Sequence, residues 1–244
     1  MKQILAIIAL LLTSTLFAQQ PQVKTYPAAA VKKLELRFDF PKTVKLSTWN
    51  RNEVQITAYV SINDGENNDA FQLLDEQADG VLKLKNIIKD MDKLPRTYKV
   101  ISDGEVKVFR SKEDMKDFRS HTGGNKFSYS EGVDMEIKLE IKVPETMAAT
   151  YVESKYGVVE LVNFLAPVEA EAKFGSVDAT LSETAVGKLS ATTRYGQIYT
   201  NMNLKLTSSE EKNFYTSITA TPGKGPSYIL TANYGNLYIR KAAQ

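Results

Sequence analysis

Cysteine is absent from this chain of 244 residues, and histidine and tryptophan each occur only once. The lack of cysteine excludes disulfides, thiolate metal sites and a lipid anchor on a cysteine. The single histidine, His121, lies in the segment SHTGG, and no G-x-S-x-G motif accompanies it. A serine–histidine–acid hydrolase is therefore disfavoured. We expect stability from packing and backbone hydrogen bonds, with no metal or cofactor.

An excess of charge of one sign is also missing. Thirty-one Lys and Arg residues face 29 Asp and Glu residues, which gives a net charge of +2. Nucleic-acid-binding proteins concentrate positive charge on one face or segment, and no such cluster occurs here. The composition therefore gives no reason to expect a nucleic-acid partner.

Long apolar runs are absent except at the start of the chain. A basic residue, an apolar stretch over 4–12 and the small residue Ala18 are typical of a secretory signal peptide. We predict a signal peptide at 1–18 and one mature domain at 19–244; the alternative is a buried N-terminal helix. No later run is long enough to span a bilayer. The sequence predicts an exported protein that is periplasmic, cell-surface or extracellular.

An internal repeat dominates the second half of the chain. An aromatic residue precedes glycine in each copy, and the glycines lie 18, 21 and 39 residues apart. A degenerate copy with Tyr215 and Thr216 at the aromatic–glycine positions divides the longest interval into two. A period near 20 residues indicates a solenoid. The four clear copies are ESKYGVVEL (153–161), EAKFGSVDA (171–179), TTRYGQIYT (192–200) and TANYGNLYI (231–239).

The residues around each glycine alternate between apolar or small and polar, as in strands with one buried face. Two residues after the glycine, every copy has an aliphatic residue. The inward positions lie at odd offsets before the glycine and at even offsets after it. This shift indicates one inserted residue at a corner. We expect glycine at the corner because it tolerates positive φ, and we expect the preceding aromatic rings to stack from rung to rung. The expected inward residues are Val152, Ala170, Ala191 and Leu230 before the glycines, and Val159, Val177, Ile198 and Leu237 after them.

The first half of the chain also has strand-like segments. Alternation and turn residues predict strands at 32–40, 43–50, 53–62, 81–88 and 135–147. Between the last two, 89–132 is rich in Lys, Asp and Gly and contains a weak strand at 105–109. We expect a long hairpin excursion or mobile loop there. The predicted fold is all-β: a single-stranded right-handed β-solenoid with rungs of about 20 residues, an N-terminal strand region and this excursion.

The segments LSTWNRNEVQITA and IKVPE, with the repeated aromatic–glycine strand, resemble the bacterial "putative adhesin" family, a β-strand-repeat domain of unknown function. The resemblance covers roughly the mature chain. It implies a right-handed β-solenoid exported to the cell envelope, and most members have no assigned activity. The chain departs from the family pattern in its long excursion and in Thr216, which replaces a corner glycine.

Several acidic groups could serve a site. Asp64, Glu66 and Asn68 resemble a calcium loop, but Asp69 and Asp75 occupy the positions where an EF-hand needs glycine and glutamate. A solvated turn fits better. Stacked carboxylates would suit a glycan-active enzyme, but Lys residues on the same face favour neutralising pairs. The carboxylates that we consider are Glu153, Glu171, Glu160 and Asp178.

Two surface groups are candidate ligand surfaces. Lys155, Lys173 and Arg194 are expected to form a cationic column at rung spacing. The second group is an aromatic–amide patch suited to stacking on sugar rings, and it comprises Gln197, Tyr199, Asn236 and Tyr238.

These patterns lead to a functional hypothesis. We expect an exported, non-enzymatic module for cell-envelope interaction, adhesin-like, with an envelope protein or a glycan as partner. The alternative is a glycan-binding or glycan-active solenoid protein, such as a lyase or hydrolase. The C-terminal segment YGNLYIRKAAQ is expected to form the last rung, whose open edge would dock a partner strand or self-associate.

Overall fold

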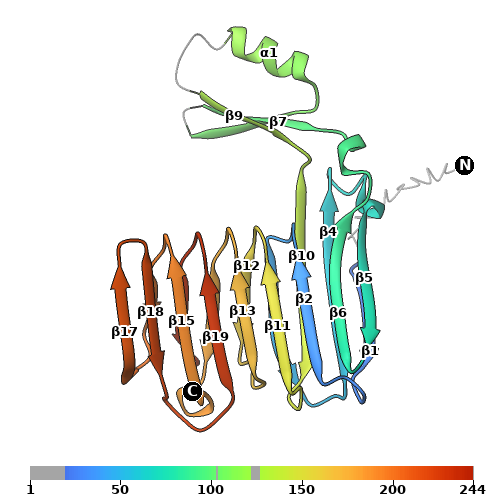
Figure 1. Ribbon diagram of the computed structural model, residues 1–244. Helices are drawn as coiled ribbons and strands as arrows, with labels where there is room; N and C mark the ends of the chain where they lie inside the picture. Colours follow the sequence, from blue (N-terminus) through green and yellow to red (C-terminus); the bar gives the residue numbers. More distant parts are fainter. Residues whose placement is uncertain (1–19, 103, 122–126, 244) are drawn as a thin grey trace, which may run out of the picture.

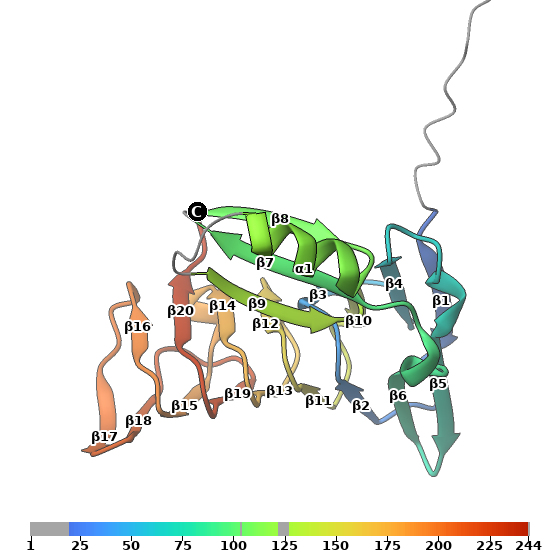
Figure 2. The ribbon, with the colours of Figure 1, turned by 90° about the horizontal axis from the view of Figure 1, so that it is seen from above.

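A computed structural model describes residues 20–102, 104–121 and 127–243. Two large β-sheets lie face to face. A smaller third sheet with one α-helix lies beyond the ends of their strands, on one side (Figures 1 and 2). The predicted all-β class is confirmed. The signal peptide expected at 1–18 lies outside the described residues.

The two large sheets share a core that runs the length of the molecule. The first sheet has eight strands, in the order β1 (Gln22–Pro27), β4 (Glu53–Ile62), β10 (Met135–Pro144), β3 (Thr43–Trp49), β12 (Val158–Val162), β14 (Val177–Leu181), β20 (Leu237–Lys241) and β16 (Ile198–Thr200). The second has nine strands, in the order β17 (Leu206–Lys212), β18 (Tyr215–Ala220), β15 (Lys188–Arg194), β19 (Ser227–Ala232), β13 (Val168–Ala172), β11 (Ala149–Ser154), β2 (Lys33–Phe38), β6 (Val81–Ile88) and β5 (Phe71–Ala78).

The repeat builds rungs, each made of a strand of the second sheet, a corner, and the next strand in the first sheet. The rungs are β2–β3, β11–β12, β13–β14, β15–β16 and β19–β20, and neighbouring rungs pair in parallel wherever two of them meet. The inward positions predicted from the alternation are buried, as Val152, Ala170 and Leu230 are on one side of the corner and Val177 and Leu237 on the other. Ile198 is partly buried. Alternation therefore identified the core correctly.

The corner glycines are required for a reason different from the predicted one. Positive φ occurs at Gly65, Gly80 and Gly104 but at none of the corner glycines. Instead, corners of adjacent rungs lie in backbone contact. A Cβ on Gly175 would lie 2.0 Å from the carbonyl oxygen of Gly157, closer than any real Cβ contact. Gly235 and Gly196 continue this column, so glycine is needed for close approach rather than for a left-handed backbone.

The rungs do not stack in chain order, which corrects the predicted position of the C-terminal rung. Strand β19 pairs with β13 on one side and β15 on the other, and β20 likewise pairs with β14 and β16. The last rung in sequence is therefore inserted between the third and fourth. The expectation that its edge is open for a partner strand is wrong, because both sides of β19 and β20 are paired.

The degenerate repeat is not a rung. Strands β17 and β18 form an antiparallel hairpin, and β18 runs antiparallel to β15. The chain reverses at Asn213, which has φ of 39°. Tyr215 and Thr216 therefore begin a reversed strand rather than a corner, and Ile218 on that strand is buried.

The sheets are mixed, so a single-stranded right-handed solenoid is not what the structure shows. Strands β1, β4 and β10 pair antiparallel in the first sheet, and β5 pairs antiparallel to β6 in the second. Neither β1 nor β5 was expected as a strand. The predicted strands at 32–40, 43–50, 53–62 and 81–88 match β2, β3, β4 and β6 closely.

The excursion at 89–132 is not simply a hairpin or loop. It forms a third sheet with the strand order β8 (Glu105–Phe109), β7 (Thr97–Ser102) and β9 (Phe127–Gly132), together with helix α1 (Lys112–His121). The weak strand predicted at 105–109 is β8. Short 3-10 turns lie at Asn68–Ala70, Met91–Lys93 and Glu183–Ala185. Among the described residues, no helix has the length and apolar content needed to cross a membrane.

Candidate functional site

The corner aromatic residues form one continuous stack that crosses the strands of the second sheet at the strand ends where the corners lie. Because the last rung is inserted, Tyr234 lies between Phe174 and Tyr195, with ring centroids 5.2 and 5.0 Å away. Tyr156 stacks on Phe174 at 5.6 Å, and Phe214 stacks on Tyr195 at 5.1 Å. Phe40 packs against Tyr156 at 6.4 Å. We call these six residues the aromatic ladder.

The ladder is exposed along its length. The five rings from Tyr156 to Phe214 are between 52% and 68% exposed, although large apolar side chains usually gain by burial. Their centroid spacing exceeds the contact distance of stacked ring planes, about 3.5–4 Å, so the rings are offset and each shows an edge and part of a face. The surface is therefore a ridged apolar strip rather than a flat platform.

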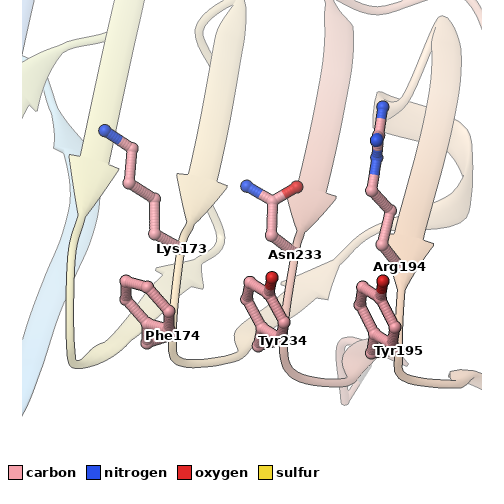
Figure 3. A pocket seen from close by; sticks show the side chains of 6 residues that line it. All are labelled: Lys173, Phe174, Arg194, Tyr195, Asn233 and Tyr234. Atoms are coloured by element: carbon pink, nitrogen blue, oxygen red, sulfur yellow. The ribbon is translucent and has the colours of Figure 1, made fainter.

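A row of polar side chains runs beside the ladder. Lys173, Asn233 and Arg194 each precede a ladder residue, and Figure 3 shows their side chains alongside the three rings of Phe174, Tyr234 and Tyr195. These six residues line a shallow pocket of about 320 Å³. We call this pocket the ladder groove; the ladder continues past it to Tyr156, which Lys155 precedes.

The carboxylates next to the groove are held in a hydrogen-bonded network. Glu153 accepts hydrogen bonds from Lys173 at 2.7 Å, Arg37 at 2.8 Å and the Tyr151 hydroxyl at 2.9 Å. Glu171 accepts a hydrogen bond from Asn233 Nδ2 at 3.1 Å, and its carboxylate lies 3.1 Å from the Tyr151 hydroxyl, whose single proton is shared between the two carboxylates. The prediction of neutralising pairs is correct for Glu153 and Lys173.

The network determines the protonation state of its members. Partial burial alone would raise the pKa of Glu153, but hydrogen bonds from Lys173 and Tyr151 outweigh burial and hold that pKa below its usual value. Burial and the two carboxylates raise the pKa of Tyr151, so its hydroxyl remains a donor. The Glu153 carboxylate is thus stabilised as a charged acceptor.

The predicted cationic column is interrupted. Lys155 and Lys173 lie on adjacent rungs, but Asn233 separates Lys173 from Arg194. Lys155 Nζ lies 5.2 Å from the ring centroid of Tyr156, and Lys173 is paired with Glu153. Sequence reasoning found the cations and the ring stacking but missed Asn233, Phe40 and Phe214. The signal available for Phe40 was its place in the sequence: it is an aromatic residue at the end of the predicted strand 32–40, two positions before Lys42.

The aromatic–amide patch lies on the first sheet. Tyr199 and Tyr238 stack with centroids 5.3 Å apart and planes 11° apart. Their hydroxyls bond to Gln197 and Asn236, and Asn236 Oδ1 also accepts a hydrogen bond from the Gln197 backbone N–H at 2.9 Å. The four residues are brought together as expected. However, Gln197 Oε1 and both ends of the Asn236 amide are already hydrogen-bonded within the patch.

The other acidic candidates lie apart from the groove. Arg110 bonds both Asp64 and Glu66, so the calcium-like loop is an ion-paired turn. Asp178 lies opposite Glu160 in the first sheet and pairs with Arg240 at 2.8 Å. His121 ends α1, where its ring nitrogen lies 2.9 Å from the Asp117 carbonyl. Within the part of the chain that the structure describes, no three acidic or histidine side chains gather as a metal site would require.

Comparisons with known proteins add little. No protein-family model matches the chain, and no curated protein matches it. Among solved structures, the chain is similar to a "putative cell adhesion protein" from Clostridium sporogenes, with 10% identity and a TM-score of 0.47, over 91% of this chain and 100% of that one.

Proposed function

We propose that this protein is an exported, non-enzymatic interaction module of the adhesin-like kind, which binds an extended ligand along the ladder groove. One observation carries the proposal: a continuous strip of half-exposed aromatic rings runs across the rungs with a row of polar side chains beside it. Exposed contiguous apolar surface of this kind is typical of interaction sites.

The backbone around the groove supports recognition by side chains. Strands β11, β13, β19 and β15 are each paired on both sides. Their N–H and C=O groups are therefore engaged within the sheet, and a ligand cannot bind there by adding a strand. A ligand along the groove would meet aromatic edges, the amide of Asn233 and the cation of Arg194.

The network beside the groove supports a binding role over a catalytic one. A general acid or base needs a proton it can exchange near neutral pH. Glu153 is instead held ionised by three donors, and the raised pKa of Tyr151 keeps its hydroxyl protonated. Glu153 positions Lys173 along the groove, and Glu171 positions Asn233.

A binding screen with a ladder variant tests the proposal. Mature protein and Tyr234→Ser would be applied to an array of envelope glycans, with Tyr59→Ser as the control because Tyr59 is an exposed tyrosine on β4. We expect Tyr234→Ser to reduce binding about tenfold or more and Tyr59→Ser to leave it unchanged, given equal melting temperatures.

Two results of this screen would contradict the proposal. Equal binding by both variants would show that the ladder is not the site. Turnover of a bound glycan by the wild-type protein would show that the module is enzymatic. Export is tested separately, by fractionation of cells that express the full chain. Retention of the protein in the cytoplasm would contradict export.

A further inference from the structure

We infer that the ladder groove takes a linear acidic polysaccharide, whose carboxylates pair with Lys155 and Arg194 while its sugar rings lie against the aromatic ladder. This inference rests on the proposed function and adds the chemical class of the ligand. It follows from which charges beside the groove are already neutralised.

Cations outnumber carboxylates beside the groove. Arg37, Lys155, Lys173 and Arg194 lie on the same outer face as Glu153 and Glu171. Arg37 and Lys173 share Glu153, and Glu171 is bonded by a hydroxyl and an amide. In the described parts of the chain, neither Lys155 nor Arg194 has an ion-pair partner. Two cations beside the groove are therefore available to an anionic ligand.

The spacing of these two cations favours a polymer over a small anion. Lys155 follows β11 and Arg194 is the last residue of β15, and these two strands are separated by three inter-strand steps through β13 and β19. Three steps of about 4.8 Å place their backbones about 14 Å apart. A single phosphate or monosaccharide cannot reach both, whereas a chain with a charge on every unit can.

The chemistry between the two cations favours a sugar over an acidic peptide. A pyranose ring combines an apolar C–H surface with polar edges, and the groove combines offset aromatic rings with Asn233 and Arg194. Aromatic rings attract polarised C–H groups. An acidic peptide in extended form would gain most from free backbone groups, which the paired strands do not offer. Arg194 can bind a carboxylate through two parallel hydrogen bonds.

Titration with polygalacturonate, and with the same polymer after methyl esterification, tests the inference. Esterification removes the charge but keeps the sugar backbone. We expect the acidic polymer to bind more tightly, the affinity to fall as salt rises, and the disaccharide to bind far more weakly than the polymer. Arg194→Gln should weaken binding about tenfold and reduce the salt dependence.

Lys188→Gln is the matched control, because Lys188 is an exposed cation at the opposite end of the same strand, β15. It should bind as the wild type does. Equal binding of both polymers, with no effect of Arg194→Gln, would overturn the acidic class while leaving the ladder site in place. Equal binding of polyglutamate would overturn the polysaccharide assignment. If Tyr234→Ser has no effect on any ligand that the wild type binds, the proposed function itself fails.

Discussion

A corner glycine of this protein lies under the carbonyl group of the glycine on the neighbouring rung. Cβ atoms at Gly157, Gly175, Gly196 and Gly235 would each lie about 2 Å from a backbone oxygen. A backbone clash cannot be relieved by rotating a side chain, so a methyl group there must push two rungs apart. The repeat thus keeps glycine because a Cβ would clash with the neighbouring rung. The sequence pattern alone was equally compatible with a need for positive φ.

Gly175→Ala is therefore predicted to destabilise the protein by about 1–3 kcal/mol, the usual cost of overpacking a filled site. Gly132→Ala is the control, because a Cβ at Gly132 meets nothing within 4 Å. Its free energy of unfolding should stay within about 0.5 kcal/mol of the wild-type value. Urea unfolding of the three proteins measures both. Equal midpoints for Gly175→Ala and Gly132→Ala would contradict the glycine column.

Glu153 gives a prediction about pH. Its pKa is lowered in the folded protein, so the unfolded chain binds more protons as the pH falls through the unfolded value, about 4.3. The stabilisation by this carboxylate is complete above that value and is lost on acidification toward the lower folded pKa. We predict that the difference in unfolding free energy between wild type and Glu153→Gln narrows as the pH is lowered from 6 to 3, that is, over about three units. A constant difference would show that Glu153 titrates normally.

At the scale of elements, the order of rungs depends on a hairpin. After β16 the chain forms β17 and β18, which run antiparallel to each other beside β15, and residues 221–226 lead back to β19. The hairpin pairs with the outer side of β15, and β19 pairs with β13 and with the other side of β15. Their copies of the repeat are so similar that sequence alone cannot distinguish this insertion from sequential stacking.

Strand β20 is therefore predicted to exchange its amide hydrogens slowly. The backbone N–H of Leu237 donates to the Gln197 carbonyl at 2.9 Å, and both neighbours of β20 are in place. Protection at Leu237–Ile239 should be high in dilute protein and independent of concentration. Strand β17, at the edge of its sheet, should exchange faster. Fast exchange at β20 that slows as protein concentration rises would instead indicate an open terminal rung.

Elements differ in how far the sequence predicts them. Strands with strict alternation, such as β4 and β10, were predicted closely because one face is buried and the other exposed. Helix α1 was missed because its sequence KEDMKDFRSH has only two large apolar residues, Met115 and Phe118, which is too few for a helical pattern. Strand β5 was missed because five of its eight residues, from Leu74 to Ala78, are exposed without alternation. Its place is fixed by pairing with β6 rather than by its own pattern.

At the scale of the whole molecule, the candidate site was only partly predictable. Lys173 and Arg194 could be named from the repeat, because each precedes a corner aromatic residue. The neighbours that complete the groove, Asn233 and Tyr234, come from the inserted rung. Which side chains are adjacent along the ladder therefore depends on the order in which the rungs stack, and no local sequence pattern encodes that order. The uninterrupted cation column was wrong for the same reason.

The ladder groove exists only if the last rung lies between the third and fourth, and cysteine cross-linking tests this most directly. The chain has no cysteine of its own, so introduced pairs report alone. Thr231 is in register with Glu171 on one side and Thr192 on the other. Neighbouring strands of a sheet are separated by about 4.8 Å, which suits a disulfide, whereas strands two steps apart are too distant.

We predict that the pairs Glu171→Cys with Thr231→Cys, and Thr192→Cys with Thr231→Cys, form disulfides under mild oxidation, and that Glu171→Cys with Thr192→Cys does not. Mass spectrometry of proteolysed, non-reduced protein measures all three. Efficient cross-linking of positions 171 and 192, without cross-linking of either to 231, would show that the rungs stack in chain order and would contradict the account of both the fold and the groove.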